Sequence, residues 1–456
     1  MKFIHTADLH IDSPMKGLSK LSKELAEKVK RATRQAFANL VEFALNERVD
    51  FILIAGDLFD GDWDQVASGK WILDQLKRLN DAEIPVFIVY GNHDKKCSLL
   101  KNWTNVLPER VKVLAQDQPQ TFYYSPHFPG QILDYKRMQE ARGQGHDVAA
   151  ISGRSYPLWD CRDDLVLDYP APTPNAFNIG ILHTGLGGAA AQAYAPTDVD
   201  ELNAKGYHYW ALGHQHLRET IQTQPSWIGY SGSVQARHVN EREPKGFYLV
   251  ECNSHGMIAE PNFIPCDCVR WELVSLDLTG LTEDDLTART HEICARLLDK
   301  NQGRFVVLRL ELTGRTPMYH TLCQQREKLA DYFDTMIPDM VDDLAFEQIK
   351  IDQLKPETSE HFWESGIFKS IDALIQDKIN GYAEMCAARQ SGLLEPSAKV
   401  LSAEDEKICK DLKNAVNKTE KPPKSFDAVV DFSDPEMFLR LWERARETLA
   451  DVFTQD

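Results

Sequence analysis

Five short segments rich in Asp, His and Asn constrain this chain most strongly, because each directly follows an apolar run. Runs such as DFILIA at 50–55 alternate with helical patterns, which predicts parallel strands with helices on the sheet faces. In such sheets the carboxyl ends of the strands form the crevice where ligands bind. We therefore expect the five segments to lie together at one rim. They are Asp8-Leu9-His10, Gly56-Asp57-Leu58-Phe59-Asp60, Gly91-Asn92-His93-Asp94, His183 within ILHTG, and Gly213-His214-Gln215-His216.

The residue types in these segments are typical of metal ligands. Imidazoles suit Mn²⁺, Fe²⁺ or Zn²⁺, whereas Mg²⁺ and Ca²⁺ prefer oxygen ligands. One carboxylate can bridge two ions, and Asp57 is the candidate for that position. Two ions about 3.5–4 Å apart would favour phosphoester hydrolysis, because they generate hydroxide and take up charge on the attacking and leaving oxygens. The expected metal ligands are Asp8, His10, Asp57, Asn92, His183, His214 and His216.

His93 stands apart from these ligands and is the predicted catalytic histidine. An imidazole oriented by a carboxylate can stabilise charge on the phosphoryl group or protonate the leaving oxygen, and Asp94 is the expected partner. The alternative for Asp94 is a turn cap without a catalytic part. We expect Asp60 and Asp12 to cap turns or support the ligands, and His5 to be a satisfied core residue.

Length and composition limit the remaining choices. A chain of 456 residues is long enough for two or three domains. Its net charge of −18 argues against a protein that coats nucleic acid by charge alone. A basic stretch between Lys16 and Arg34 is either a solvated helix face or a contact for a nucleic-acid backbone. Irregularly spaced cysteines and the lack of a long apolar run predict a cytoplasmic protein with no membrane span.

The hydrophobic pattern predicts three parts. Residues 1–268 carry the motifs, with an irregular surface segment expected at 122–147. The βαβαβ order of 269–353 predicts a small α+β domain, and 354–456 is expected to be helical with a hydrophilic linker. An apolar stripe over 438–453 would pack in a core or bind in a partner's groove.

The ordered motifs DxH, GDxxD, GNHD, H and GHxH resemble the calcineurin-like metallophosphoesterase superfamily, and within it the SbcD-type DNA double-strand-break repair exonucleases. The resemblance covers about the first 250 residues. It implies an α/β fold in which a two-sheet β-sandwich is flanked by helices, followed by a small α+β capping domain. Carried over, the pattern puts Asp8, His10, Asp57 and His216 on one metal, puts Asp57, Asn92, His183 and His214 on the other, and makes His93 the catalytic histidine with Asp94 as its partner.

The resemblance also implies an activity and partners. It indicates a manganese-dependent DNA exonuclease, or an exonuclease that is also an endonuclease, that acts in DNA repair with a coiled-coil ABC-type ATPase and often as a homodimer. Gly69-Lys70 is followed by Trp71, so no phosphate-binding loop for ATP is present and ATP dependence would come from the partner. The alternative is a metallophosphoesterase acting on small nucleotides or cyclic nucleotides, which would use the same motifs. A vestigial, non-catalytic domain is disfavoured because no ligand is missing.

Overall fold

The computed structural model describes residues 1–13, 31–60, 66–97, 106–187 and 194–357, together with some isolated residues. The chain forms two compact units. The first holds Met1–Val274, Ala288–Leu310 and Ala330–Ile349, and the second holds Ser275–Thr287, Glu311–Leu329 and the residues from Lys350 onward.

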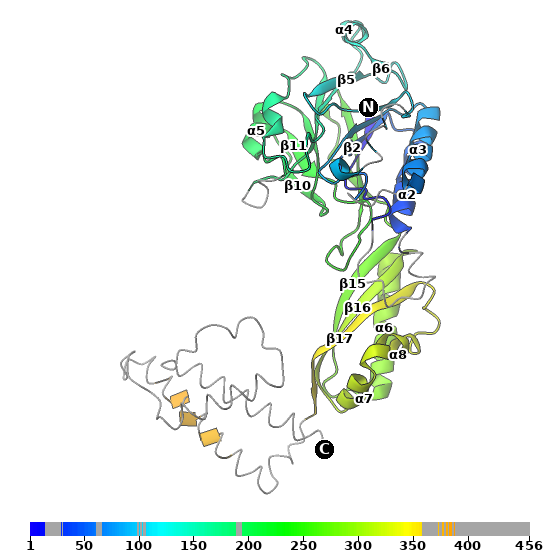
Figure 1. Cartoon of the computed structure of the whole chain (residues 1–456), viewed down its shortest axis with the longest axis vertical. Helices are drawn as coiled ribbons and strands as arrows, with labels where there is room; N and C mark the ends of the chain where they lie inside the picture. The colour runs from blue at the N-terminus through cyan, green and yellow to red at the C-terminus, as the bar shows by residue number, and fades with distance from the viewer. Residues whose placement is uncertain are drawn as a thin grey trace. The chain divides into compact units, whose positions relative to one another are not determined.

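The first sheet of the described residues is built around four parallel strands in the order β1-β2-β3-β4. Figure 1 labels β2 of this sheet. β12 pairs with β1 in the antiparallel sense, and β13 and β14 pair with β12. β1, β2 and β3 are buried along nearly their whole length, which explains the unbroken apolar run of β2. The strands are β1 (Lys2–Thr6), β2 (Phe51–Ala55), β3 (Val86–Val89), β4 (Val111–Val113), β12 (Gly246–Asn253), β13 (Gly256–Met257) and β14 (Asn262–Pro265).

The second sheet has the order β10-β11-β9-β8-β7-β5-β6 in the described part of the chain. Its four central strands, β11, β9, β8 and β7, are parallel, and β10, β5 and β6 are antiparallel additions at the edges. The strands are β5 (Gln120–Tyr124), β6 (Ile132–Leu133), β7 (Ala149–Gly153), β8 (Phe177–His183), β9 (Tyr209–Gly213), β10 (Glu219–Gln222) and β11 (Trp227–Tyr230).

The two sheets pack face to face, as the two-sheet sandwich expected from the family resemblance requires. Phe3 of the first sheet stacks on Phe51 of the same sheet at 4.9 Å and meets Tyr209 of the second sheet edge-on at 5.4 Å. Burying each large side chain of this kind contributes about 1.5–3 kcal/mol. The buried side chains between the sheets include Phe3, Phe51, Leu53, Phe87, Val89, Ile151, Phe177, Ile179, Tyr209 and Trp227.

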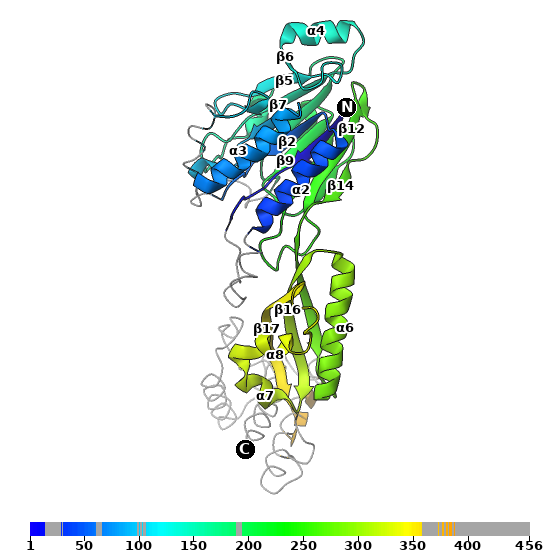
Figure 2. The same ribbon diagram turned by 90° about the vertical axis from the view of Figure 1, so that its right-hand side faces the viewer.

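Helices cover the outer faces of the sandwich. α2 (Ala32–Glu47) and α3 (Val66–Asp81) lie side by side over the first sheet (Figure 2). The second sheet is covered by the 3₁₀ turn η4 (Leu165–Asp168) and α5 (Val199–Ala204). The sequence pattern predicted the helices of the first sheet, because their apolar residues recur at helical spacing.

The expectation of an irregular segment at 122–147 is wrong. This stretch contains the end of β5, then β6 and the helix α4 (Tyr135–Gly143). Asp134 caps the helix by accepting a hydrogen bond from the backbone N–H of Arg137 at 2.8 Å. The helix is short and mostly polar, so its apolar periodicity was too weak to detect.

The α+β part contains β15 (Val269–Asp277), α6 (Glu283–Asn301), β16 (Phe305–Thr316) and β17 (Leu344–Pro356), with strand order β15-β16-β17. The single helix expected between β16 and β17 is instead divided into α7 (Tyr319–Gln324), the turn η6 (Arg326–Lys328) and α8 (Leu329–Asp334). Within the first unit, Trp271 and Phe305 belong to the same buried cluster as Ala32 of α2.

The linker and terminal amphipathic helix expected beyond residue 357 lie outside the described residues, as do the lysines of the basic stretch from Lys16 to Lys30. None of the helices in the described ranges has the length and apolar character needed to cross a membrane.

Candidate metal centre

All five ligand-rich segments lie at the carboxyl ends of strands. Asp8 and His10 follow β1, Asp57 follows β2 and Asn92 follows β3, so these residues come from the first sheet. His183 ends β8, and His214 and His216 follow β9, so these come from the second sheet. The site is therefore built across the seam between the two sheets. Five of the seven are buried: Asp8, His10, Asp57, Asn92 and His183.

The backbone at the site adopts conformations that L-residues rarely use. The φ angles are 51° at Asp8, 41° at His10, 55° at Asp57 and 108° at His214. Each such residue costs on the order of 1–3 kcal/mol and persists only where surrounding contacts hold it. Backbone hydrogen bonds from Asp8 N to Gly56 O and from His10 N to Asp57 O, both 3.0 Å, supply such contacts. This clustered strain points to a functional site.

Gly56 and Gly91 leave room for the side chains of Asp57 and His183 because they lack a Cβ atom. A Cβ on Gly91 would lie 2.2 Å from Asp57 Oδ1 and 2.8 Å from His183 Nε2. A Cβ on Gly56 would lie 2.3 Å from His183 Nδ1, and the φ of Gly56 is +93°. The glycine that opens each of the two motifs is thus required by the close approach of the ligands.

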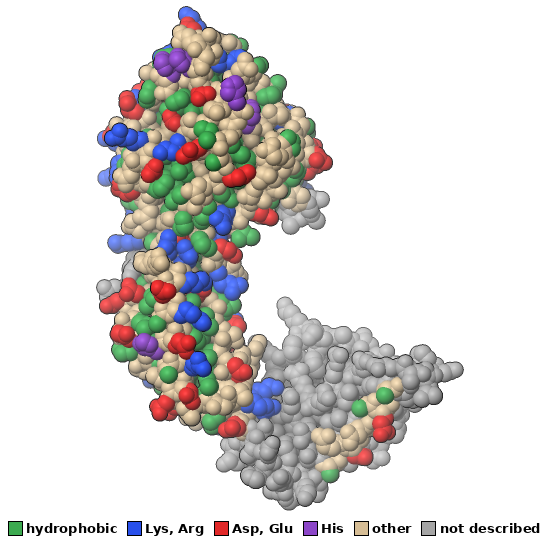
Figure 3. Space-filling view, turned by 180° about the vertical axis from the view of Figure 1, so that it is seen from behind, with side chains coloured by type: hydrophobic (Ala, Val, Ile, Leu, Met, Phe, Trp, Pro, Cys, Tyr) green, Lys and Arg blue, Asp and Glu red, His purple; other side chains and the backbone are tan. Residues whose placement is uncertain are grey.

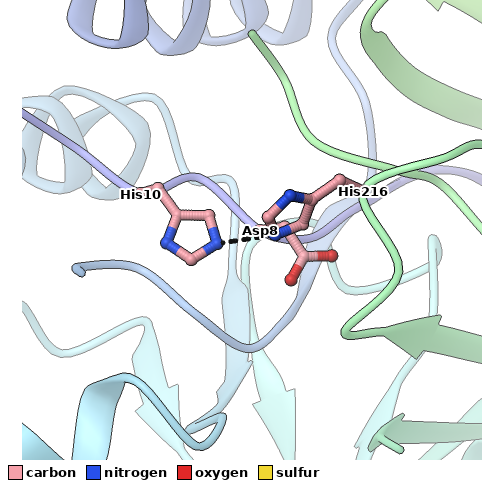
Figure 4. A group of neighbouring side chains, drawn as sticks. All are labelled: Asp8, His10 and His216. Atoms are coloured by element: carbon pink, nitrogen blue, oxygen red, sulfur yellow. Dashed lines mark hydrogen bonds between the residues drawn. The ribbon is translucent and has the colours of Figure 1, made fainter. Parts of the chain in front are cut away.

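One group of ligand atoms comes from Asp8, His10 and His216 (Figure 4). The Nε2 atoms of His10 and His216 face each other at 3.1 Å, and Nδ1 of His10 is buried without a hydrogen-bond partner. Both carboxylate oxygens of Asp8 accept from the backbone N–H of His214, at 3.1 and 3.2 Å. Two imidazole nitrogens and a carboxylate that converge in this way fit a transition-metal ion.

A second group contains Asp8, Asp57 and His183. Nδ1–H of His183 donates to the carbonyl of Ala55 at 2.9 Å, so Nε2 is the nitrogen that faces Asp57 Oδ2, at 3.4 Å, and Asn92 Oδ1, at 3.0 Å. The second ring nitrogen of a metal-binding histidine commonly has such a partner. Asp57 Oδ2 also lies 3.8 Å from His10 Nε2, so its carboxylate lies between the two groups.

Burial and charge together set the protonation of this centre. Burial acts to raise the pKa of Asp57, but His183, His10 and His93 hold it well below its ordinary value. Burial acts to lower the pKa of His183, but Asp57 raises it to about 9. Burial lowers the pKa of His214 to about 3. The His214 imidazole is thus neutral at pH 7 and could bind a cation directly. The His183 imidazole is protonated at pH 7 and would have to lose a proton to bind one.

The expected pairing of His93 with Asp94 is not found. Nδ1 of His93 lies 2.6 Å from Asp60 Oδ1. Asp94 instead accepts hydrogen bonds from the backbone N–H groups of Phe59, at 3.1 Å, and Gly91, at 3.0 Å, which is the turn-cap alternative. The side chains of His93 and Asp94 thus point in different directions although the two residues are adjacent in sequence. Asp60, the last residue of the GDxxD motif, is the carboxylate that contacts His93.

Two of the other residues considered from sequence have structural roles. The carboxylate of Asp12 accepts hydrogen bonds from Nε and Nη2 of Arg34 and from Ser68. His5 bonds to the Tyr209 hydroxyl at 2.9 Å and the Leu212 carbonyl at 3.1 Å, and burial lowers its pKa to about 3. His5 is thus the satisfied core residue that was expected.

Three residues between β11 and β12 that contact His216 were not predicted from the sequence. Nδ1–H of His216 donates to Glu241 at 2.8 Å, and the buried ammonium of Lys245 donates to the His216 carbonyl at 2.6 Å. The guanidinium of Arg237 lies 3.3 Å from His216 Nδ1. The sequence signal is a run of charged residues, RHVNEREPK at 237–245, in a segment bounded by buried strands.

The surface around the sandwich carries mixed charge. On the face drawn in Figure 3, acidic and basic side chains of the sandwich are interspersed rather than separated by sign. The net charge of −18 is therefore not concentrated on this face, and the charges that act on the site are those of its own contacts.

Comparisons with known proteins agree with this geometry. The family described as calcineurin-like phosphoesterase matches residues 1–218, and the middle domain of metallophosphoesterase YhaO matches residues 271–353. The uncharacterized metallophosphoesterase YhaO of Bacillus subtilis is 32% identical over 319 residues, covering 70% of this chain and 72% of the relative.

More distant relatives are named as DNA-processing proteins. The DNA double-strand break repair protein Mre11 of Methanocaldococcus jannaschii is 25% identical over 280 residues, covering 59% of this chain and 67% of the relative. A relative in Staphylococcus epidermidis, named as a subunit of the nuclease SbcCD, is 25% identical over 303 residues, covering 63% of this chain and 76% of the relative. From its motifs, its sandwich and these matches, the chain belongs to the calcineurin-like metallophosphoesterase family.

Proposed function

We propose that this metallophosphoesterase is a two-metal DNA phosphodiesterase that acts as an exonuclease in DNA repair, with additional endonuclease activity as an alternative. The observation that carries the proposal is the assembly of every expected ligand at one rim of the sandwich. The relatives named as Mre11 and as a subunit of the nuclease SbcCD support DNA as the substrate.

The ligand set fits two divalent cations, and its histidines favour Mn²⁺ over Mg²⁺, with Fe²⁺ or Zn²⁺ as alternatives. Bound ions would supply hydroxide at neutral pH and take up charge on the attacking and leaving oxygens. Asp57 would be shared between the ions. We assign Asp8, His10, Asp57 and His216 to one ion, and Asp57, Asn92, His183 and His214 to the other.

His93 contacts the substrate in this proposal. Because Asp60 engages Nδ1, Nε2 is the nitrogen that can reach a phosphoryl oxygen or the leaving alkoxide. The hydrogen bond to Asp60 raises the pKa of His93 above its ordinary value. Asp60 therefore orients the ring and stabilises its protonated form. Asp94 supports the same loop through its backbone hydrogen bonds.

An exposed aromatic side chain beside Lys96 supports a nucleic-acid substrate. Lys96 lies three residues beyond His93, in the turn η2 (Asp94–Lys96), and its ammonium lies 4.8 Å from the ring centre of Trp159. The Trp159 side chain is 55% exposed. An exposed indole beside a cation suits a base and its phosphate in single-stranded DNA.

We also propose a partner and a compartment. The S. epidermidis relative is one subunit of a nuclease, which supports a second subunit here, and we infer that this is a coiled-coil ABC-type ATPase. The irregular spacing of the cysteines along the sequence favours the reducing cytoplasm.

The proposal is tested with linear double-stranded DNA and bis-p-nitrophenyl phosphate, each with Mn²⁺ or with EDTA. Both substrates should be cleaved only with Mn²⁺. His93→Ala should lower both rates by about 10²- to 10⁴-fold while Mn²⁺ and DNA binding persist. His255→Ala, a change in an exposed turn, is the matched control.

Three results would count against parts of the proposal. Unchanged rates in His93→Ala would remove the role of His93. Cleavage of the small diester but not of DNA, even with an ATPase partner present, would indicate a phosphoesterase for small nucleotides. Metal-independent cleavage would remove the two-metal mechanism itself.

A further inference from the structure

The guanidinium of Arg237 has an unused hydrogen-bonding edge beside the metal centre. Its side chain is only 13% exposed. Nη1 donates to Asp60 Oδ2 at 3.0 Å and to Ser13 Oγ at 2.8 Å, whereas Nε is buried and has no hydrogen-bond partner among the described residues. A buried donor on a charged group is costly to leave unpaired, so it calls for an explanation.

Arg34 shows the usual interaction of the Nε and Nη2 edge of an arginine. Its Nε and Nη2 both donate to the carboxylate of Asp12, which is the bidentate arrangement that arginine forms with oxyanions. In the described part of the chain, the Nε and Nη2 edge of Arg237 forms no such pair with a carboxylate. Nη2 of Arg237 instead has two long contacts with the ring nitrogens of His216, at 3.3 and 3.4 Å.

Those two nitrogens are poor acceptors for Arg237. Nδ1 of His216 faces Glu241 at 2.8 Å and must carry its proton there, since a carboxylate only accepts. Nε2 of His216 faces His10 in the proposed metal site. A cation bound to Nε2 would repel the guanidinium and favour its movement off the ring, which would open Nε to an anion.

The main chain holds Arg237 at the site. Its backbone N–H donates to Glu241 Oε2 at 2.9 Å, and the carbonyl of the preceding Ala236 accepts from Trp271 Nε1 at 3.3 Å. The same Asp60 that accepts from Nη1 also engages His93, so the guanidinium and the proposed catalytic imidazole share one carboxylate.

We propose that the Nε and Nη2 edge of Arg237 binds a non-bridging oxygen of the substrate's phosphoryl group. The proposal rests on the phosphoesterase function above. A planar guanidinium suits this task better than an ammonium, because it presents two parallel N–H groups to a phosphate. Arg237 would then fix the phosphoryl group beside His93.

The test measures the binding of inorganic phosphate to the Mn²⁺-loaded full chain by calorimetry. Arg237→Gln should weaken phosphate binding by about 10- to 150-fold, the range expected for lost hydrogen bonds to a charged group. Arg237→Lys keeps the positive charge beside Asp60 but lacks the two parallel N–H groups, so its phosphate affinity should lie between those of Arg237→Gln and wild type. Arg34→Gln should bind phosphate within about twofold of wild type, because its Nε and Nη2 are already used.

Mn²⁺ affinity and melting temperature are measured for each variant. The proposal requires Mn²⁺ binding to survive in Arg237→Gln or Arg237→Lys while phosphate binding falls. Wild-type phosphate affinity in both variants, parallel loss of Mn²⁺ or of folding in both, or no saturable phosphate binding by the wild type would each overturn it. If the phosphate results hold but DNA is not cleaved, the choice of DNA as substrate fails and the role of Arg237 stands.

Discussion

Replacing Gly91 with alanine should disable the metal centre while leaving the fold in place. The added Cβ would lie 2.2 Å from Asp57 Oδ1 and 2.7 Å from His183 Cε1. Ordinary contacts of a methyl group are longer by roughly 1 Å, so the carboxylate and the ring must move by about that amount. Both side chains are proposed ligands, and Asp57 is the proposed bridge.

The expected effects differ in size. Overpacking a buried position costs about 1–3 kcal/mol of stability, and the fold should tolerate this. A misplacement of about 1 Å at reacting groups can cost about 10²-fold in rate. The Mn²⁺-dependent hydrolysis of bis-p-nitrophenyl phosphate by Gly91→Ala should therefore fall about 10²-fold, with weaker Mn²⁺ binding by calorimetry.

Gly143→Ala is the matched control, because a Cβ at this position at the end of α4 meets no atom within 4 Å. It should change neither the rate nor Mn²⁺ affinity. The steric reasoning is refuted if Gly91→Ala is folded and keeps the wild-type rate and Mn²⁺ affinity.

Three further predictions concern single contacts. Glu241→Gln replaces the carboxylate that receives the His216 proton, so Mn²⁺ affinity should fall about 10- to 100-fold by calorimetry, and an unchanged affinity would contradict its supporting role. Asp60→Asn removes the group that raises the pKa of His93, so the fall in hydrolysis rate at alkaline pH should move to lower pH; a profile that keeps its position would exclude the pairing. Burial lowers the pKa of His5 to about 3, so as pH falls below the ordinary value of 6.5 this histidine is protonated in the unfolded chain but not in the folded one. The free energy of unfolding therefore falls by about 1.4 kcal/mol per pH unit. Between pH 7 and pH 5, urea unfolding should show wild type losing about 2 kcal/mol more than His5→Gln, and equal losses would show that His5 is charged in the fold.

The grouping of the seven proposed ligands could be predicted because each follows a short apolar strand. The strands before Asp8, Asp57 and His183 are long enough to detect, and strand direction then brings their ends to one rim. The metal roles of these residues remain proposals. The antiparallel edge strands were harder to predict, because β10 is half exposed and has no apolar run.

The supporting contacts could not be predicted in the same way. Adjacency in sequence suggested Asp94 as the partner of His93, but the turn after Asn92 directs Asp94 to the backbone and leaves Asp60 for the imidazole. Glu241 lies 25 positions beyond His216, in the loop after β11 that has no regular structure. Hydrophobic periodicity predicts helices and strands but not the course of such a loop, so this contact is known only from the three-dimensional structure.

The proposed ligands come from two different sheets, so the packing between the sheets sets the distances between them. The rings of Phe3 and Tyr209 are part of this packing, and neither residue belongs to the proposed ligand set. A change in the volume of one of these rings would alter the spacing between the proposed ligands that follow β2 and those that follow β9. Substitutions in this interior should therefore change the affinity of the proposed centre for metal ions without replacing any of its proposed ligands.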